Sequence, residues 1–535
     1  MTRLAIVLTA LALSLFAASP VAAARSEFFG IVQGPALDAQ DLQGITAAKI
    51  RTARFLLLWR EVQPSQGSFN WGPADLVVGR LASHGVRPVP FVFGSPKWVN
   101  AFLARPPVDS AAHEQAWRNF LTTAVARYGP GGSYWGTPYH QQFGASATPL
   151  PVQSWQVWSE PSFQNFDPGG TVAHAAQKYA RLVEISHDAI KAKDPNASIV
   201  LAGNPCCGTW TASSFLKNLY QVPGIKSYFD VAAVHPYGRS LSDVRSQLVQ
   251  FRAVMTSNTD GSTPLWLTEF AWGSGPPDSS GHNVGLAGQQ QLLDSSFKLI
   301  LSNRRNWNVQ RIFWFFWRDP QAGSQYDDLC PICGTAGLLR YDRTAKPAYS
   351  TFRGFTAETT PPVASITAGP TQGSFTNDPT PTFTFTSNEL GSTFSCHFDA
   401  GSFTNCSSPL TRGSPLADGA HTFYVKAIDA PGNESAVRAR LFSVDTQAPQ
   451  TTITAGPSGP TTDNTPTFTF ASSESGSTFQ CRFDFEAFAA CSGPGASHTP
   501  SAALSPGSHS FEVRATDKAM NTDPTPATRT FLVIL

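Results

Sequence analysis

The sequence predicts a multidomain protein, in which an α/β domain of the (β/α)8 TIM-barrel type is followed by two small all-β sandwiches. Three observations predict it. Short apolar runs alternate with helical stretches over residues 25–355, the last third of the chain repeats itself, and all 13 tryptophans lie between Trp59 and Trp317. The chain, at 535 residues, is also too long for one ordinary domain. We therefore expect the two parts to have different roles.

Residues 1–24 have the pattern of a secretory signal peptide. Arg3 provides a charged start, an apolar run extends from Leu4 to Phe16, and small residues precede Arg25. An N-terminal membrane anchor is the alternative, but this apolar run is too short to span a bilayer. We therefore expect a secreted protein, extracellular or at the cell surface, with no membrane span.

The predicted barrel occupies residues 25–355. Its eight strands are expected at 28–32, 53–58, 87–93, 153–158, 199–203, 229–235, 265–270 and 312–317. A helix between the fourth and fifth strands is indicated by apolar residues on one face: Val172, Ala176, Tyr179, Val183 and Ile190. A doubly wound sheet is the alternative, but the sequence lacks the Gly-rich phosphate-binding turn that such a fold carries after its first strand.

The C-terminal third contains two copies of one domain, at residues 360–446 and 447–535. The segment 380–385 (TPTFTF) returns 85 positions later. Apolar and polar residues alternate between turn residues in each copy, which predicts antiparallel strands of a sandwich. The copies resemble bacterial immunoglobulin-like modules of secreted proteins. They contain no tryptophan and one tyrosine, Tyr424, so we expect spacers, with contact to a cell wall or polysaccharide surface as a further role.

The chain has eight cysteines, an even number that favours disulfides in an oxidising compartment. A spacing of ten positions in both copies predicts one bridge within each: Cys396 with Cys406, and Cys481 with Cys491. Cys330 and Cys333 form a Cys-x-x-Cys motif, which could be redox-active or half of a zinc site. A structural disulfide is favoured because no second ligand pair accompanies it. The pairing of Cys206 and Cys207 stays open.

The charge balance excludes several classes of partner. The chain has 38 basic and 37 acidic residues and a net charge of +1, which leaves no electrostatic footprint for nucleic acid or an anionic membrane. No Gly-x-Ser-x-Gly elbow and no His-Glu-x-x-His motif occurs. We therefore expect an uncharged partner such as a carbohydrate, and neither a metal nor a cofactor.

Two glutamates end predicted strands of the barrel. Glu160 follows the fourth strand in the segment WSEP, and Glu269 ends the seventh strand in the segment LTEF. Functional groups of such barrels sit at the C-terminal ends of the strands. Hydrolysis of a glycoside requires one carboxylic acid to protonate the leaving oxygen and a second carboxylate to attack the anomeric carbon or to activate water. The pair therefore predicts a glycosidase.

These motifs resemble the clan A glycoside hydrolases, which include cellulases, β-xylosidases and α-L-iduronidases. The likeness covers residues 28–355. It implies that Glu160 is the general acid/base and Glu269 the nucleophile of a retaining, double-displacement enzyme acting on a polysaccharide or oligosaccharide. Arg54 is expected to hold Glu269 as an anion, while the surroundings of Glu160 raise its pKa.

The resemblance also implies residues that bind substrate. His235 and Tyr237 would donate hydrogen bonds to the nucleophile or to sugar hydroxyls. Trp317, at the end of the eighth strand, would form the floor under the sugar. Further tryptophans just beyond strand ends could line other subsites: Trp272, Trp98 and Trp210.

One position departs from the clan A pattern. Those enzymes usually have Asn immediately before the acid/base, where it binds the sugar 2-hydroxyl, and this chain has Ser159. Interactions at that hydroxyl strengthen in the transition state, so rate and sugar preference are expected to change. The alternative function is a catalytically weakened barrel that binds carbohydrate or mediates surface adhesion. The presence of both carboxylates favours the enzyme.

Overall fold

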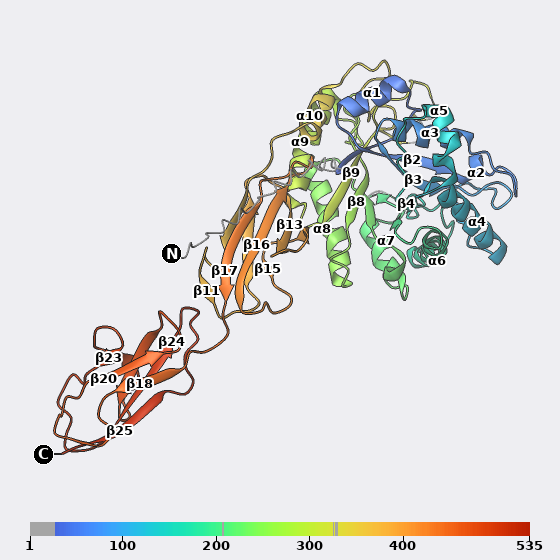
Figure 1. Cartoon of the computed structure of the whole chain (residues 1–535). Helices are drawn as coiled ribbons and strands as arrows, with labels where there is room; N and C mark the ends of the chain where they lie inside the picture. Colours follow the sequence, from blue (N-terminus) through green and yellow to red (C-terminus); the bar gives the residue numbers. More distant parts are fainter. Residues whose placement is uncertain (1–26, 206–207, 325, 327–329, 535) are drawn as a thin grey trace, which may run out of the picture. The chain divides into compact units, whose positions relative to one another are not determined.

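The computed structural model of the chain describes residues 27–205, 208–324, 326 and 330–534 (Figure 1). Two compact units are distinguished, a barrel that runs to Thr360 and a pair of sandwiches that begins at Pro361. The predicted signal peptide at residues 1–24, and both Cys206 and Cys207, lie outside the described residues. The predicted order of a barrel followed by all-β sandwiches is confirmed.

The barrel is built from one parallel sheet with the order β5-β4-β3-β2-β1-β9-β8-β7-β6. The predicted fifth strand, 199–203, corresponds to β5, and the short β6 begins just beyond the predicted range. Val200 in β5 forms a parallel bridge with Val231, which precedes β7, so the two ends of the sheet meet. Neighbouring strands follow the chain order around the ring, which excludes the doubly wound alternative. The bounds are β1 Phe29–Val32, β2 Thr52–Leu58, β3 Arg87–Phe93, β4 Ser154–Val157, β5 Ser198–Val200, β6 Asn204–Pro205, β7 Ala232–His235, β8 Leu265–Phe270 and β9 Val309–Phe315.

Helices surround this sheet (Figure 1). The predicted helix between the fourth and fifth strands is α6, where the Thr171 hydroxyl accepts a hydrogen bond from the backbone N–H of His174 and caps the first turn. The bounds are α1 Ala39–Ala47, α2 Trp59–Val62, α3 Gly72–Ser83, α4 Ala111–Tyr128, α5 Thr137–Phe143, α6 Val172–Lys191, α7 Ala212–Leu219, α8 Leu241–Ser257, α9 Gly285–Asn303 and α10 Pro347–Thr356, with short 3-10 helices at Ser133–Trp135 and Ile225–Tyr228.

The alternation of side chains along β2 explains how a charged group comes to lie inside the barrel. Ala53, Phe55 and Leu57 are buried on the face toward the helices. Arg54 and Leu56 lie on the opposite face, toward the barrel axis. Arg54 is fully buried, whereas Leu56, two residues nearer the C-terminal end, is 44% exposed. The interior therefore opens to solvent just beyond Arg54.

Each C-terminal copy is a sandwich of a three-stranded and a five-stranded sheet. The sheets of the first copy have the orders β10-β12-β15 and β11-β17-β16-β13-β14, and the second copy repeats both orders with β18 to β25. The bounds are β10 Ala364–Ala368, β11 Phe375–Thr376, β12 Thr382–Ser387, β13 Thr393–Phe398, β14 Thr404–Cys406, β15 Leu410–Thr411, β16 Gly419–Ile428, β17 Arg438–Val444, β18 Thr451–Ala455, β19 Pro460–Thr461, β20 Phe468–Ser472, β21 Thr478–Phe483, β22 Ala489–Ala490, β23 Ser497–His498, β24 Gly507–Thr516 and β25 Ala527–Val533.

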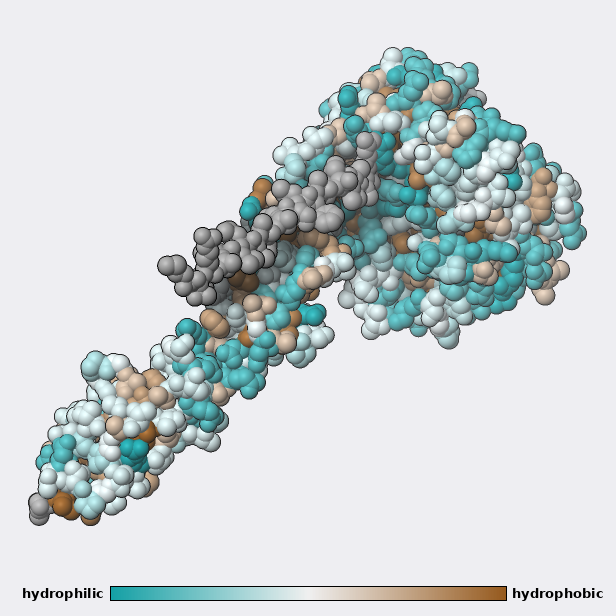
Figure 2. Space-filling view, viewed as in Figure 1, coloured by the Kyte–Doolittle hydropathy of each residue, from teal (hydrophilic) through white to brown (hydrophobic). Residues whose placement is uncertain are grey.

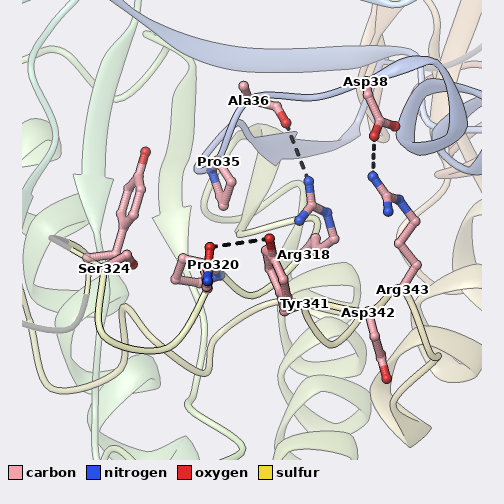
Figure 3. Close-up of a pocket in the computed structure, with 11 residues that line it drawn as sticks. Pro35, Ala36, Asp38, Arg318, Pro320, Ser324, Tyr341, Asp342 and Arg343 are labelled. Atoms are coloured by element: carbon pink, nitrogen blue, oxygen red, sulfur yellow. Dashed lines mark hydrogen bonds and ion pairs between the residues drawn. The ribbon is translucent and has the colours of Figure 1, made fainter.

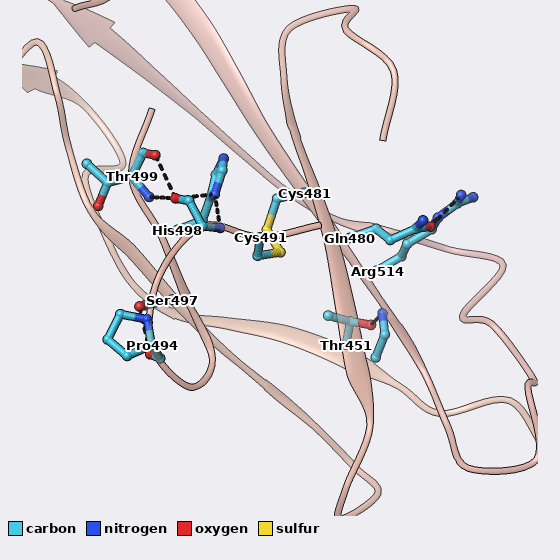
Figure 4. The surroundings of a disulfide bond; sticks show 11 residues. Thr451, Gln480, Cys481, Cys491, Pro494, Ser497, His498, Thr499 and Arg514 are labelled. Atoms are coloured by element: carbon cyan, nitrogen blue, oxygen red, sulfur yellow. Dashed lines mark hydrogen bonds between the residues drawn. A yellow bond between two sulfur atoms is a disulfide. The ribbon is translucent and has the colours of Figure 1, made fainter. Parts of the chain in front are cut away.

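Stacked phenylalanines and one disulfide hold each sandwich. The rings of Phe383 and Phe423 lie 4.3 Å apart in the first copy, and those of Phe468 and Phe511 lie 4.3 Å apart in the second. Small domains with modest cores gain from such covalent links. The predicted bridges are present, as Figure 4 shows for the second copy: Cys396–Cys406 and Cys481–Cys491.

Cys330 and Cys333 are joined in a disulfide as well, in the segment between β9 and α10. Both sulfurs are therefore used in the bond, and the structure favours the structural prediction over the zinc alternative. Figure 2 shows mostly hydrophilic and intermediate residues on the visible face of the barrel, with hydrophobic residues in small separate patches. Among the described residues, no helix combines the length and apolar character needed to cross a bilayer.

Candidate active site

The two predicted glutamates converge at the C-terminal end of the barrel. Glu160 follows β4 and Glu269 lies in β8, and both approach His235 at the end of β7. A side-chain oxygen of each glutamate and a ring nitrogen of His235 all lie within 4.8 Å of one another. The Glu160 side chain is 30% exposed and that of Glu269 is 13% exposed. Glu160 is therefore the more accessible carboxyl of the pair.

Glu269 is surrounded by hydrogen-bond donors. Nη1 of Arg54 donates to its Oε1 at 2.7 Å, and the hydroxyl of Tyr237 donates to its Oε2 at 3.0 Å. Nδ1 of His235 lies 3.6 Å from the same Oε2. Burial raises the pKa of Glu269, but the electrostatic effect of the neighbouring His235 ring, the charge of Arg54 and the hydrogen bonds from Arg54 and Tyr237 together lower it below its ordinary value. Glu269 is therefore held as an anion.

The two donors to Glu269 are themselves fixed by burial. The guanidinium of Arg54 lies 3.8 Å from the centre of the Phe91 ring, and its Nε donates to Oε1 of Gln156 at 2.5 Å. Burial lowers the pKa of Arg54, and the charge of Glu269 opposes this. Burial and the two carboxylates raise the pKa of Tyr237 well above its ordinary value. Tyr237 therefore keeps its proton and acts as a donor.

The backbone that presents Glu160 is strained. Trp158 has φ 72° and Glu160 has φ 50°, a left-handed region that bulky residues rarely adopt and that costs about 1–3 kcal/mol for each residue. Trp158 is fully buried, with its ring 4.8 Å from that of Phe93, and the backbone N–H of Glu160 donates to the carbonyl of Gly203 at 3.1 Å. Tertiary packing therefore determines the direction of the Glu160 side chain.

His235 lies against Glu160 on one side and Thr268 on the other. Its Nδ1 is 2.8 Å from Oε1 of Glu160, and its Nε2 is 3.0 Å from Oγ1 of Thr268. A side chain at position 203 would collide with this ring, because a Cβ on Gly203 would lie 2.1 Å from Nε2 of His235. Gly203, Gln156 and Thr268 were not predicted as site residues. Their only signal in the sequence is a polar residue or a glycine within an otherwise apolar strand.

The cluster of Glu160, His235 and Glu269 has the composition of a metal site. Arg54 argues against a cation there, because its buried positive charge already lies 2.7 Å from Glu269 and would repel one. The arrangement fits proton transfer and nucleophilic attack better.

Two tryptophans predicted to contact the sugar lie in the core instead. Trp317 is 1% exposed and Trp272 is 0% exposed. A Cβ on Gly44 in α1 would lie 2.8 Å from the Trp317 ring, which also packs edge-on against Tyr349 of α10. Nε1 of Trp272 donates to the carbonyl of Gly238 at 2.7 Å. Neither ring has a face open to a ligand, so the prediction of sugar platforms at these two positions is wrong.

The prediction for Trp317 is wrong because the eighth strand of the barrel, β9, ends earlier than predicted. β9 stops at Phe315, so the alternation of its side chains does not extend to Trp317. Phe315, the last residue of β9, is 8% exposed, and its ring centre lies 6.3 Å from that of Tyr237, which donates to Glu269. Partly exposed apolar side chains on β2 and β3 lie at the same end of the barrel: Leu56, Phe91 and Phe93.

Three other predicted residues keep part of their surface exposed. Trp98 and Trp210 are half-buried on loops that follow β3 and β6, and Nε1 of Trp98 donates to the carbonyl of Gln63 at 3.1 Å. Ser159 is half-buried next to Glu160. Within the part of the chain that the structure describes, no side-chain hydrogen bond is made by Ser159, so its hydroxyl is available to a ligand.

A cavity of about 580 Å³ lies where the segments after β1 and β9 meet (Figure 3). Its wall includes Arg318, which binds Asp41 and the carbonyl of Ala36, and Arg343, which pairs with Asp38. Tyr341 is 50% exposed. The wall therefore combines paired charges with one accessible aromatic ring.

Aromatic contacts connect this cavity to the carboxylates. The ring of Tyr237, which binds Glu269, lies 6.3 Å from that of Phe315. Phe315 lies 3.7 Å from Phe316, and Phe316 lies 5.8 Å from Tyr326 in the cavity wall. The cavity is therefore on the same face of the barrel as the carboxylates, a few side chains away.

The fold and the site together define a TIM-barrel protein with a carboxylate pair at the C-terminal ends of its strands. Residues 132–334 match the family model for the glycosyl hydrolase catalytic core, a segment that contains Glu160, His235, Tyr237 and Glu269. This part of the barrel is similar to a glycosyl hydrolase catalytic core, and the predicted resemblance to glycoside hydrolases is confirmed. Among curated proteins, no sequence matches this chain.

Several solved structures have a similar fold. A family 39 glycoside hydrolase from the gut symbiont Bacteroides cellulosilyticus has 16% identity, with 79% of this chain and 80% of that chain covered and a TM-score of 0.46. GH5_18 from Bifidobacterium longum subsp. longum has 16% identity, coverage of 66% and 84%, and a TM-score of 0.47. A glucosidase from Croceicoccus marinus has 14% identity, coverage of 91% and 95%, and a TM-score of 0.44. These similarities are distant.

Proposed function

We propose that the protein is a secreted, retaining glycoside hydrolase, which cleaves O-glycosidic bonds of a polysaccharide or oligosaccharide without a cofactor. The observation that carries this proposal is the closeness of the two carboxyl groups, whose nearest oxygens lie within 4.8 Å. Retaining enzymes hold the two groups about 5–5.5 Å apart, whereas inverting enzymes leave about 6.5–9.5 Å for a water molecule. The short separation supports direct attack by a carboxylate.

In this mechanism Glu269 attacks the anomeric carbon while Glu160 protonates the leaving oxygen. The result is a covalent glycosyl-enzyme, and Glu160 then takes a proton from the water that hydrolyses it. The lowered pKa of Glu269 suits a nucleophile that must be ionised. The greater exposure of Glu160 suits a group that must reach both the leaving oxygen and the incoming water.

The surroundings of the carboxylates support a substrate of several sugar units. We propose that Phe315, in place of Trp317, lies under the sugar at the cleavage point, and that Tyr341 stacks on a more distant unit in the neighbouring cavity. A volume of about 580 Å³ is within the range of small-molecule sites. Ser159 is proposed to bind the 2-hydroxyl, directly or through water.

Secretion is part of the proposal. Three disulfides among the described residues suit an oxidising compartment, as does the signal pattern of residues 1–24. The two sandwiches are proposed to hold the barrel away from a surface, with a cell wall or polysaccharide as the surface contacted.

The experiment that tests the enzyme replaces Glu269 with Gly and offers an activated aryl glycoside. We expect the wild type to release the aryl alcohol, Glu269→Gly to be inactive, and azide to restore release by forming a glycosyl azide of inverted configuration. Glu269→Gln should be inactive with or without azide. Glu184→Gln, on α6, is a matched control that should keep full activity.

Two results would count against the proposal. One is wild-type activity in Glu269→Gly, and the other is failure of the wild type to cleave any glycan in a broad screen of aryl glycosides and polysaccharides. The second candidate function is carbohydrate binding without hydrolysis, which Ser159 at the usual asparagine position favours. Calorimetric binding of a glycan that the wild type leaves intact would support that alternative.

A further inference from the structure

A buried row of hydrogen bonds leads from Arg54, which pairs with the proposed nucleophile Glu269, to Glu160, the proposed acid/base. Nε of Arg54 donates to Oε1 of Gln156 at 2.5 Å, and Nε2 of Gln156 donates to Oγ1 of Thr268 at 3.2 Å. Oγ1 of Thr268 lies 3.0 Å from Nε2 of His235, whose Nδ1 lies 2.8 Å from Oε1 of Glu160. Arg54, Gln156, Thr268 and His235 are all 0% exposed. Bulk water therefore does not compete within the row.

The direction of the row is determined at its first member. A guanidinium has donors and no acceptor, so the amide of Gln156 must turn its oxygen toward Arg54. Its nitrogen then faces the carbonyl of Leu201 at 3.0 Å and Oγ1 of Thr268. The opposite amide orientation would place N–H groups against Arg54 and an oxygen against the Leu201 carbonyl, two unfavourable contacts in a buried place.

This orientation of the Gln156 amide determines which atom accepts the hydrogen bond from the Thr268 hydroxyl. Because Oγ1 accepts from Gln156, its O–H needs an acceptor, and buried hydroxyls are rarely left without one. Among the described residues, the acceptor within reach is Nε2 of His235. A neutral imidazole that accepts at Nε2 carries its hydrogen at Nδ1.

We propose that Gln156 and Thr268 are positioning residues, which fix the tautomer of His235 so that Nδ1–H donates to Oε1 of Glu160. With Oε1 occupied as an acceptor, Oε2 is the oxygen that carries the transferable proton. In the other tautomer, the lone pair of Nδ1 would accept that proton from Glu160 and withhold it from the leaving oxygen. The catalytic consequence rests on the proposed function, whereas the tautomer does not.

Several charged or titratable groups face His235. Glu160 and Glu269 lie on its Nδ1 side, at 2.8 Å and 3.6 Å. Arg54 and Tyr237 lie beyond, each bonded to Glu269. Thr268 lies on the other side of the ring, at Nε2, so a substitution at Thr268 reaches Glu160 through the imidazole.

Nitrogen-15 NMR of the histidine-labelled full chain tests the tautomer directly. The wild type is expected to show a protonated Nδ1 and an unprotonated Nε2 for His235, assigned by the loss of these signals in His235→Gln. Thr268→Val keeps the shape and removes the hydroxyl, and should give a mixture of tautomers. Thr268→Ser should restore the wild-type signals. Thr123→Val, on the outer surface of α4, is the matched control and should leave them unchanged.

Kinetics test the consequence for catalysis. General acid catalysis contributes about 10²–10⁴-fold, so Thr268→Val should lower kcat at least tenfold on glycosides with poor leaving groups. On activated aryl glycosides, which need little protonation, the change should be under threefold. The basic limb of the kcat/KM profile should shift in Thr268→Val and return in Thr268→Ser, which a merely structural role would not produce.

A wild-type spectrum with Nε2 protonated would overturn the proposal, whether or not any variant folds. Unchanged tautomer signals in a folded Thr268→Val protein would also overturn it. Absence of hydrolysis by the wild type would count against the proposed function alone, because the NMR measurement needs no substrate.

Discussion

Nη1 of Arg54 lies 2.7 Å from Oε1 of Glu269, and the guanidinium is fully buried beside a carboxylate that is 13% exposed. β2 and β8 bring the two residues together from positions 215 residues apart. A buried charge without its partner is costly. Each residue of this pair therefore stabilises the other, and the pair links the stability of the barrel to the ionisation of its proposed nucleophile.

Arg54→Met should lower the free energy of unfolding by about 3–5 kcal/mol at pH 7, because it leaves the Glu269 carboxylate buried and unpaired. The pKa of Glu269 is lowered in the folded protein, so its stabilising effect is present above the ordinary carboxyl pKa and is lost as the pH falls through the folded value. The difference between variant and wild type should therefore shrink in acid, as urea unfolding from pH 7 to pH 3 would reveal.

The matched control for this prediction is Arg118→Met. Arg118 is 27% exposed and lies 3.6 Å from Asp188, a surface pair expected to contribute at most about 1 kcal/mol. An equal loss of stability for Arg54→Met at pH 7 and pH 3 would contradict the role given to Glu269.

Tyr237→Phe should lower kcat/KM by about 10- to 100-fold. The variant removes a hydrogen bond to a charged group, which is worth about 1.5–3 kcal/mol, and should raise the pKa of Glu269. The acidic limb of the pH–rate profile should move to higher pH. Tyr228→Phe, outside the site, serves as control. An unchanged profile for Tyr237→Phe would be inconsistent with the 3.0 Å contact acting on the nucleophile.

Ser159→Asn should raise kcat on glycosides that carry a 2-hydroxyl, by up to about tenfold, because a longer amide side chain reaches that hydroxyl directly. The same variant should have little effect on the matching 2-deoxy glycoside. Comparing the two substrates in steady-state kinetics is the measurement. A gain of the same size on both would show that the amide acts elsewhere.

Trp317→Phe and Phe315→Ala should affect different quantities, the first the stability of the barrel and the second the KM for substrate. Trp317 is buried against α1 and α10, so Trp317→Phe should cost about 1–3 kcal/mol of stability through a cavity and leave KM unchanged. Phe315→Ala should raise KM severalfold. Thermal unfolding and steady-state kinetics of both variants show which of the two aromatic residues contributes to substrate binding. A raised KM in a stable Trp317→Phe protein would restore Trp317 as the sugar platform.

Tyr341→Ala should raise KM for oligosaccharides of three or more units at least threefold and leave KM for an aryl monoglycoside unchanged. Tyr341→Phe keeps the ring and loses the hydroxyl contact with Gln321 at 3.3 Å, so it should bind like the wild type. Equal effects of Tyr341→Ala on the KM of short and long substrates would show that the cavity is not part of the substrate-binding site.

The sequence by itself determined features that are local in the chain. The period of the strands, the cysteine spacing within each repeat and the glutamates at two strand ends can be recognised within short segments, and the repeat itself is found by comparing two such segments 85 positions apart. The observed strands agree with the predicted ones to within about three residues at most ends. The fifth strand is the exception, because regular pairing ends at Val200 in β5 and the short β6 begins only beyond the predicted range.

Only the tertiary structure shows which aromatic residue of β9 lies beside Tyr237 and how the Glu160 carboxyl is held. Trp317 and Phe315 are two residues apart, but β9 ends at Phe315, and Trp317 packs against α1 and α10. Arg54, Gln156, Thr268 and His235 come from four strands. They meet because closure of the barrel turns alternate side chains toward one axis, where burial without water forces each polar group to find its partner in another strand.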